Sequence, residues 1–90
     1  MEVRVDKYLF AMRIYKTRSI ATDACKCGRV KMNGVELKPS RVFHVGDIFT
    51  VRKGPIIYTY RILQLSENRL GAKMVPNYME DITPPEQLEI

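Results

Sequence analysis

Apolar residues recur with a helical period near the start of the chain. Tyr8, Met12 and Tyr15 are spaced i, i+4, i+7, which places them on one face of an α-helix. Asp6 precedes this face, and aspartate often caps a helix N-terminus because its carboxylate accepts a free backbone N–H. The pattern therefore predicts a helix over residues 6–15, which ends at the polar Lys-Thr-Arg sequence.

A second helix is predicted after this polar break. Ser19 is expected to open it, since the serine hydroxyl can accept a backbone N–H of the first turn. Ile20, Ala24 and Cys27 form its apolar stripe. Gly28 follows as the expected left-handed C-cap, a conformation that a residue with a Cβ atom resists.

Beyond this glycine the apolar period changes to two, which is typical of strands. Val30 and Met32 alternate with polar residues. Asn33 and Gly34 form a strong hairpin signal, because both residues tolerate positive φ. The further strands predicted between turns are Val35–Leu37, Val42–Val45, Ile48–Arg52, Ile56–Leu65 and, with a weaker pattern, Leu70–Val75.

The order of these elements indicates an α+β domain, in which two packed helices lie against a small, mostly antiparallel sheet. Ninety residues leave room for one core, and the domain is expected to span residues 1–75. Residues 76–90 contain three prolines, several acidic residues and no clear period. They are expected to form an acidic tail that lies on the domain or stays mobile.

The charges are unevenly distributed along the chain. Residues 1–54 hold twelve basic and five acidic residues, a net charge of +7, whereas residues 55–90 have a net charge of −2. A basic half indicates a polyanionic partner, of which nucleic acid is the commonest and an anionic membrane surface the second. Solubilising surface charge is the alternative that composition alone leaves open.

Membrane and export signals are not expected. No apolar run approaches the roughly 20 residues of a membrane-spanning helix. The N-terminus is charged from its second residue, unlike a secretory signal peptide. We therefore expect a cytoplasmic protein that does not bind a membrane.

Few residues have the chemistry for catalysis or metal binding. Cys25 and Cys27 form a Cys-x-Cys pair, and His44 is the single histidine. Zinc sites need four such ligands, and the chain offers three. In addition, side chains spaced i, i+2 on a helix point in different directions, so the two thiols cannot act together. Both cysteines are therefore expected to be small, mostly buried helix residues. Catalytic motifs and phosphate-binding glycine loops are absent. We expect neither enzymatic activity nor a cofactor, a metal or a small-molecule substrate.

Basic residues gather where the two predicted helices meet. Lys16-Thr17-Arg18-Ser19 lies at this junction, and the free N–H groups of a helix N-terminus beside two cations favour a phosphate. Arg18, Thr22, Lys26 and Arg29 follow at steps of four, four and three, which places them along one stripe. Lys31 and Asn33 continue outward on the next strand, and Lys38 and Arg41 flank a Pro-Ser turn. This pattern favours RNA or DNA binding.

Four motifs within Arg4–Val51 together resemble the RNA-binding domain named after ribosomal protein S-four. They are the R-V-D-K-Y-L opening, the K-T-R-S junction, the G-R-V-K-M-N-G hairpin and the closing P-S-R-V-F-H-V-G-D. All four occur in order and at normal spacing, over just more than half of the chain. In that family, the two helices and the following hairpin form one module that docks on structured RNA.

Among short stand-alone members, the chain is most similar to the heat-shock-protein-fifteen family. Those proteins bind the large ribosomal subunit when it still carries a nascent chain on tRNA, and related small proteins act in ribosome-associated quality control. The resemblance implies a non-catalytic role on ribosomal RNA and tRNA after stress. Enterobacterial members carry a basic C-terminal extension, whereas this chain ends acidic.

The resemblance and the charge pattern together predict the residues that bind RNA. The basic residues are expected to neutralise phosphates, and the small polar residues to bond phosphate or 2′-hydroxyl groups. Arg52 and Lys53 lie at a strand end beyond the resemblance and are expected to be peripheral. The predicted RNA-binding residues are Arg4, Arg13, Lys16, Thr17, Arg18, Ser19, Lys26, Arg29, Lys31, Asn33, Lys38 and Arg41.

Two other functions remain open at this point. Tyr58 and Tyr60 fall on the same side of a predicted strand and would suit a protein–protein adaptor, although we favour their packing within the sheet. The same module is also appended to pseudouridine synthases and to a tRNA synthetase. The chain is therefore alternatively an accessory that delivers RNA to a separate modifying enzyme.

Overall fold

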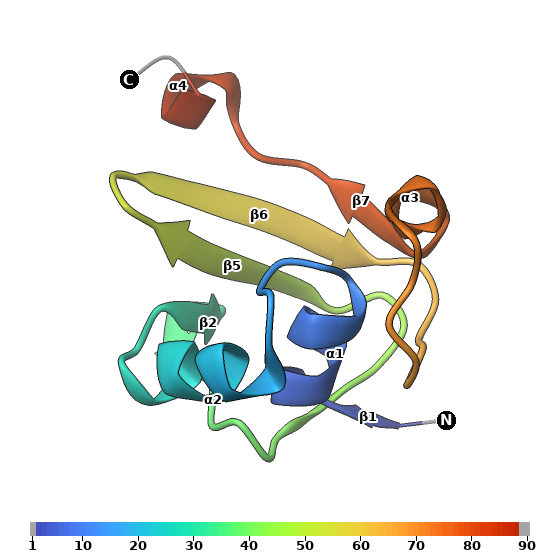
Figure 1. The fold of residues 1–90 in the computed structure, drawn as a ribbon. Coiled ribbons are helices and arrows are strands. Elements are labelled where there is room, and N and C mark those ends of the chain that lie inside the picture. The colour runs from blue at the N-terminus through green and yellow to red at the C-terminus, as the bar shows by residue number, and fades with distance from the viewer. Residues whose placement is uncertain (1, 89–90) are drawn as a thin grey trace.

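Two helices cover one face of an antiparallel sheet in the computed structural model, which describes residues 2–88 (Figure 1). This arrangement confirms the predicted α+β fold class. The elements are β1 (Val3–Arg4), α1 (Val5–Ala11), α2 (Arg18–Lys26), β2 (Val30–Met32), β3 (Val35–Glu36), β4 (Val42–Phe43), β5 (Ile48–Lys53), β6 (Ile56–Ile62), the 3₁₀ turn η1 (Ala72–Met74), α3 (Val75–Tyr78), β7 (Met79–Asp81) and α4 (Pro85–Leu88).

The five-stranded sheet has the order β3-β2-β5-β6-β7, and every neighbouring pair is antiparallel. A separate two-stranded ribbon pairs β1 with β4, so that Val3 lies opposite Phe43. The hairpin prediction is confirmed: Asn33 and Gly34 have φ values of 54° and 78°, and they join Met32 to its partner Val35. Positive φ at both central residues gives the turn the twist of the flanking strands.

The core lies between the helices and the sheet. Tyr8 of α1 meets Phe43 edge-on at 5.5 Å and Phe49 at 6.2 Å between ring centroids, and the two phenylalanine rings lie 4.7 Å apart. All three side chains are fully buried. The Tyr8 hydroxyl stays paired because it donates to the carbonyl of Tyr78 at 3.3 Å. Burial nevertheless raises the pKa of Tyr8 well above its usual value.

Helix α1 is shorter than predicted. It ends at Ala11, and Arg13 takes a left-handed conformation with φ 63°. Asp6 is not the N-cap: Arg4 occupies that position without a side-chain cap, and Asp6 lies inside the first turn with its carboxylate buried. The spacing that predicted a longer helix is real, but Met12 and Tyr15 face the core from the loop that follows it.

The prediction that Ser19 caps α2 is wrong. Thr17 is the N-cap, and its hydroxyl oxygen accepts the backbone N–H of Ile20 at 3.1 Å. Threonine and serine serve equally in this role, so composition alone does not choose between Thr17 and Ser19. Instead, the left-handed turn at Arg13 directs the chain so that α2 begins after Thr17, and this makes Thr17 the cap.

The buried face of α2 is rotated relative to the predicted stripe. Ala21, Ala24 and Cys25 are buried, whereas Ile20 is 47% exposed and Cys27 is exposed. Small side chains on the inner face let α2 approach α1 closely, and tertiary packing of this kind overrides the preference of a single isoleucine for burial. The expectation of a buried cysteine therefore holds for Cys25 and is wrong for Cys27.

The C-terminal third differs most from prediction. Leu70–Val75 is not a strand but leads into η1 and α3. Part of the expected tail is built into the fold, since β7 pairs with β6 and Met79 is 7% exposed. Glu80 and Asp81 are exposed, and charges on so short an edge strand discourage further pairing. Residues 89–90 of the expected tail lie outside the described residues.

Among residues 2–88, no helix is long and apolar enough to cross a membrane.

A matched pair of methionines tests whether β7 belongs to the core. Met79→Ala should lower the free energy of unfolding by about 2–4 kcal/mol, because it removes a buried side chain and leaves a cavity. Met74→Ala should change it by less than about 0.5 kcal/mol, because Met74 is 46% exposed. Urea denaturation of both variants checks this, and equal midpoints would contradict the placement of β7.

Candidate nucleic-acid interface

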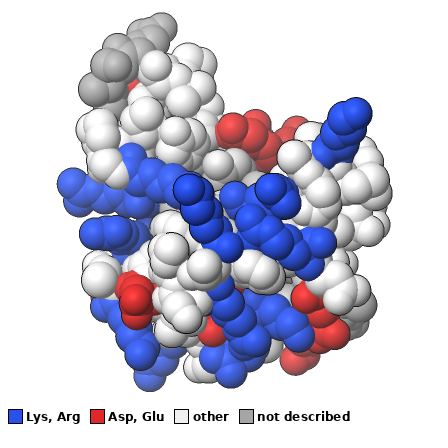
Figure 2. Space-filling model, viewed as in Figure 1, with Lys and Arg blue, Asp and Glu red and all other residues white. Residues whose placement is uncertain are grey.

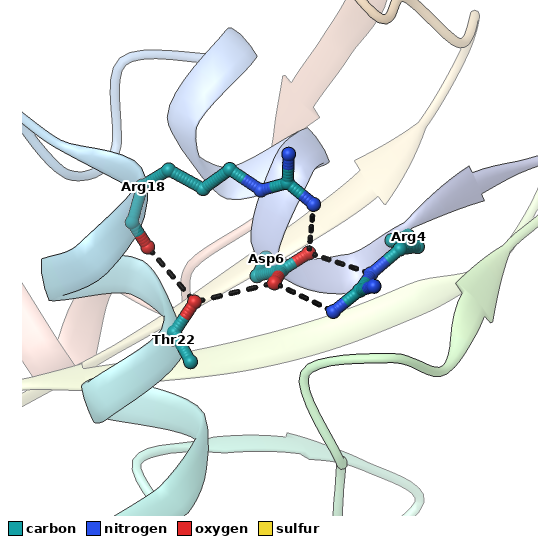
Figure 3. A network of polar contacts seen from close by, with 4 residues as sticks. All are labelled: Arg4, Asp6, Arg18 and Thr22. Carbon is teal, nitrogen blue, oxygen red and sulfur yellow. Dashed lines mark hydrogen bonds and ion pairs between the residues drawn. The ribbon is translucent and has the colours of Figure 1, made fainter.

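One buried carboxylate organises the junction between the two helices (Figure 3). The side chain of Asp6 is 3% exposed. Arg4 grips it with two nitrogens, Nε to Oδ1 at 3.2 Å and Nη2 to Oδ2 at 3.1 Å. Arg18 approaches Oδ1 from α2 at 3.6 Å, and the Thr22 hydroxyl lies 3.2 Å from Oδ2. Two cations and a hydroxyl therefore compensate a charge that burial alone would disfavour.

The two arginines keep binding capacity after they hold Asp6. Their side chains are 48% and 47% exposed. A guanidinium carries five N–H donors, of which Arg4 uses two and Arg18 one in these contacts. The carboxylate fixes the orientation of both side chains, so less rotamer entropy remains to be lost when the free donors meet a phosphate.

Thr22 ties this network to the helix backbone. Its hydroxyl oxygen is 3.0 Å from the carbonyl of Arg18 and 3.2 Å from the Asp6 carboxylate, and its single proton can serve only one of them at a time. The predicted stripe therefore begins with residues that face α1. Arg18 and Thr22 are held by Asp6, whereas Lys26 and Arg29 further along the stripe are exposed.

The loop between α1 and α2 is pinned by a residue from the second half of the chain. Arg69 donates to the carbonyls of Phe10 at 3.0 Å, Tyr15 at 3.1 Å and Lys16 at 3.5 Å. Its guanidinium also lies 4.5 Å from the centroid of the Phe10 ring. The Phe10 carbonyl lies in the last turn of α1 and also accepts the backbone N–H of Arg13 at 3.1 Å, whereas the Tyr15 and Lys16 carbonyls lie in the loop that follows. Arg69 thus fixes the approach to the predicted binding junction.

Lys53 reaches the same loop from the end of β5, while its peripheral role in RNA binding stays a prediction. Its ammonium donates to the carbonyl of Ile14 and lies 5.0 Å from the centroid of the Tyr15 ring. Desolvation lowers the pKa of Lys53. Sequence reasoning missed Lys53 and Arg69 because both lie far along the chain from the residues they contact, and no periodic signal links them.

A second group of cations surrounds a hollow beside the β2–β5 pair. Arg29 and Arg52 line it together with Cys27, Gly28 and Gly54, and its volume is about 390 Å³. The backbone N–H of Arg52 donates to the carbonyl of Arg29 at 2.9 Å, which holds the two residues side by side. Arg52 was also predicted to be peripheral to RNA binding, and it lies next to the predicted binding residue Arg29.

Gly28 shapes this hollow. Its φ is +74°, and a Cβ atom there would come within 2.4 Å of the Glu36 carboxylate. The positive φ favours glycine, while the Glu36 carboxylate is the end of an exposed side chain that can move aside. Lys31 shares an adjoining hollow with Arg29 and Arg52.

The remaining predicted residues surround these two groups. Lys26 and Lys38 line a common hollow. Arg41 and Pro39 accept, through their carbonyls, the backbone N–H groups of Val5 and Asp6, which brings the β3–β4 loop against the start of α1. The others are exposed: Arg13 and Lys16 in the α1–α2 loop, Ser19 on the first turn of α2, and Asn33 at the hairpin.

One face of the molecule is rich in basic side chains. Lys and Arg side chains cover much of the view over α2, the α1–α2 loop and the neighbouring end of β5, and acidic side chains show as smaller patches (Figure 2). A face of this kind attracts a polyanion over a wide area. Part of the basic surface comes from Arg52 and Lys53, which lie outside the recognisable motifs.

The described part of the chain holds no cluster of three or more His, Cys, Asp or Glu residues placed to bind a metal ion. The buried Cys25 thiol has a pKa raised to about 11 by desolvation and by the nearby Asp6 carboxylate. A thiol with so high a pKa stays protonated and is a poor nucleophile. Cys25 therefore serves the core.

Comparison with known proteins agrees with this geometry. The S4 domain family matches residues 3–49. A Heat shock protein 15 homolog of Aeromonas salmonicida is 39% identical over 80 residues, covering 89% of this chain and 61% of that protein. The RQC P-site tRNA stabilizing factor of Listeria monocytogenes is 41% identical over 66 residues, covering 73% of this chain and 72% of that protein.

A solved structure extends the likeness beyond the motifs. The trimeric structure of Vibrio cholerae Heat Shock Protein 15 is similar with a TM-score of 0.86 and 35% identity, over 98% of this chain and 87% of that chain. The chain spans 61% and 54% of the length of the Aeromonas and Haemophilus homologs of Heat shock protein 15.

The structural weight of the Asp6 carboxylate is open to a direct test. Asp6→Asn should lower the free energy of unfolding by about 1–3 kcal/mol, because the amide loses the charge-assisted fork of Arg4 and the ion pair with Arg18. Asp23→Asn, at an exposed position of α2, is the control and should change it by less than about 0.5 kcal/mol. Thermal unfolding of both variants measures the difference. If the two melt alike, the network is not a structural tie.

Proposed function

This chain belongs to the S4 domain family, and we propose that it binds structured RNA without catalysing a reaction, through the face that carries the Asp6 network. The observation that carries the proposal is the pair of half-exposed arginines, Arg4 and Arg18, held by one buried carboxylate. Arranged donors on a basic face suit phosphates, because the guanidinium fork matches the geometry of phosphate oxygens.

The proposed mode of recognition is shape rather than sequence. Side chains do not reach the base edges in the deep, narrow major groove of A-form RNA, so proteins bind such helices through phosphates and 2′-hydroxyls. Arg4 and Arg18 would hold phosphates at one end of the face. Arg29, Lys31 and Arg52 would hold them at the other, beside the hairpin. Two separated groups of cations on rigid elements suit the surface of a folded RNA better than they suit a flexible RNA chain.

We place the RNA target on the large ribosomal subunit that still holds peptidyl-tRNA, in the cytoplasm. Two observations support this finer proposal. Relatives that match most of this chain are named for P-site tRNA stabilisation, and the match to Heat Shock Protein 15 covers nearly the whole chain. A non-catalytic binding module acts by what it stabilises, so its effect would be to hold a stalled complex for quality control.

The adaptor function suggested by Tyr58 and Tyr60 has less support. Tyr60 packs against the buried Phe49 ring at 5.7 Å, and the two tyrosine rings stack at 6.2 Å. Burial, followed by the negative charge of Asp81, raises the pKa of Tyr60 to about 12. Tyr60 thus belongs largely to the sheet.

Salt dependence tests whether Arg18 contacts phosphate. For the unmodified protein on a folded ribosomal RNA hairpin, log K against log salt should fall with a slope of roughly −3 to −5 if four to six phosphates are neutralised. Arg18→Ala should weaken binding by about 1–3 kcal/mol. It should also make the slope shallower by the contribution of about one phosphate. Lys73→Ala removes an exposed lysine of η1 and should leave both unchanged. Equal, small losses in the two variants would reduce binding to a diffuse charge effect.

The cellular target is tested by sedimentation. After a stress that splits ribosomes during translation, the protein should sediment with free large subunits that retain tRNA. An Arg4→Ala/Arg18→Ala variant should stay in the soluble fractions. Equal distribution over small subunits and translating ribosomes would exclude this target while leaving RNA binding intact. A stable complex with an RNA-modifying enzyme would instead support the delivery function.

A further inference from the structure

A hollow opens between the α1–α2 loop and the β6–β7 edge of the sheet, next to the proposed RNA-binding face. Its volume is about 340 Å³, within the lower range of small-molecule sites. The walls are partly apolar and partly polar, and the apolar part includes Met12, Ile14, Val75 and Met79. Tyr60 contributes an aromatic ring that stacks in parallel on Tyr58, with an angle of 7° between the ring planes.

Two cations and one carboxylate also line this hollow. Arg13 and Lys53 line it from the side of the α1–α2 loop. Lys53 is fixed by its bond to the Ile14 carbonyl, and Arg13 by a bond of 3.3 Å to the carbonyl of Leu70. The loop that carries Arg13 leads directly into Arg18 and the Asp6 network. The α1–α2 loop therefore links the hollow to the Asp6 network along the chain.

The carboxylate is Asp81, which lies opposite Tyr60 in the β6–β7 pairing. Its Oδ1 accepts the backbone N–H of Thr83 at 3.0 Å and the Thr83 hydroxyl at 2.6 Å. Within residues 2–88, its Oδ2 has no hydrogen-bond partner. An ionised carboxylate can only accept, so a ligand that meets this oxygen must present a donor.

An aromatic and apolar wall, adjoining cations and one free acceptor together match the chemistry of a nucleotide. Unstacked RNA bases bind by stacking on aromatic side chains and by hydrogen bonds to their edges, and carboxylates accept from exocyclic amino groups such as the N4 group of cytosine. An apolar protein side chain would leave the Asp81 Oδ2 atom without a donor, and it would not use the N–H groups that Arg13 and Lys53 have left after binding Leu70 and Ile14. The charges thus favour a nucleotide over a protein segment.

Building on the proposed RNA binding, we propose that this hollow takes one unstacked nucleotide of the bound RNA, whose base carries an exocyclic amino group. The base lies among Met12, Ile14, Met79 and Tyr60, and its amino group donates to Asp81. Lys53 and Arg13 hold its phosphate. Uracil is disfavoured, because its O4 would place an acceptor against the carboxylate.

The test compares short single-stranded oligocytidylate and oligouridylate on the ¹⁵N-labelled full chain at neutral pH. Oligocytidylate should bind roughly fivefold or more tightly than oligouridylate and should shift the amide signals of Tyr60 and Asp81. Asp81→Asn should abolish this preference. The expected sign is informative, because removal of one negative charge would by electrostatics alone strengthen binding of both oligonucleotides.

A matched lysine pair supplies the control. Lys53→Gln should weaken the binding of both oligonucleotides by roughly fivefold or more, because it removes a charge-assisted contact with phosphate. Lys73→Gln should have little effect on either affinity. Melting curves verify that the variants stay folded. Asp81→Asn is a second, independent variant that should stay folded, because its position is exposed and asparagine has the same shape as aspartate.

A folded RNA hairpin, titrated in parallel, separates this inference from the proposed function. If the hairpin binds but the two oligonucleotides bind equally, or leave the hollow amides unshifted, the nucleotide site is wrong and RNA binding stands. Concentration-dependent shifts of these amides without RNA would assign the hollow to a second copy of the chain and overturn the proposal. Failure of every RNA to bind would overturn both.

Discussion

The interface depends on a single buried negative charge. The Asp6 carboxylate is enclosed between β1, α1 and α2, and it is compensated by Arg4, Arg18 and Thr22. The backbone N–H of Asp6 also donates to Pro39 at 3.2 Å, which adds the β3–β4 loop to the same point. Four segments that would otherwise be free to shift are tied together, because a buried carboxylate that loses its partners is far more costly than one that keeps them. The arginines that stabilise the fold are thereby held in a fixed orientation with part of each side chain exposed, and the proposed mode of RNA binding uses the same side chains.

The second half of the chain braces this arrangement. Arg69 holds the carbonyls after α1, and Lys53 holds the Ile14 carbonyl, so the loop between the helices is fixed from outside the matched family segment. The edge strand β7 closes the sheet beside that loop. This division explains why residues beyond 51 lack recognisable motifs. Contacts with backbone carbonyls and the filling of space can be made by many side chains, whereas phosphate recognition restricts residue type and position.

Local signals in the sequence were enough to predict those elements whose backbone geometry restricts the choice of residues. The Asn33–Gly34 turn and the alternating β5 strand follow from positive φ and from a period of two. Features set by tertiary contacts were not predictable. The apolar stripe of α2 was misassigned because burial there is chosen by the approach of α1, which favours Ala21 over Ile20. The strand β7 has three residues, of which two are acidic, and only its pairing with β6 reveals it. The RNA-binding residues themselves were proposed from motif and charge, but their grouping around Asp6 and around Arg52 needed the fold.

The most direct test of the central claim is the effect of Asp6→Asn on RNA affinity in two backgrounds. If Asp6 acts by orienting Arg4 and Arg18, the substitution weakens binding of a folded RNA hairpin in the otherwise unmodified protein, although it makes the protein more positive. In an Arg4→Ala/Arg18→Ala background, where nothing is left to orient, the same substitution should strengthen binding slightly, because only the loss of a repulsive charge remains. An increase of affinity in both backgrounds, with the domain still folded, would show that Asp6 merely opposes RNA and would contradict the account.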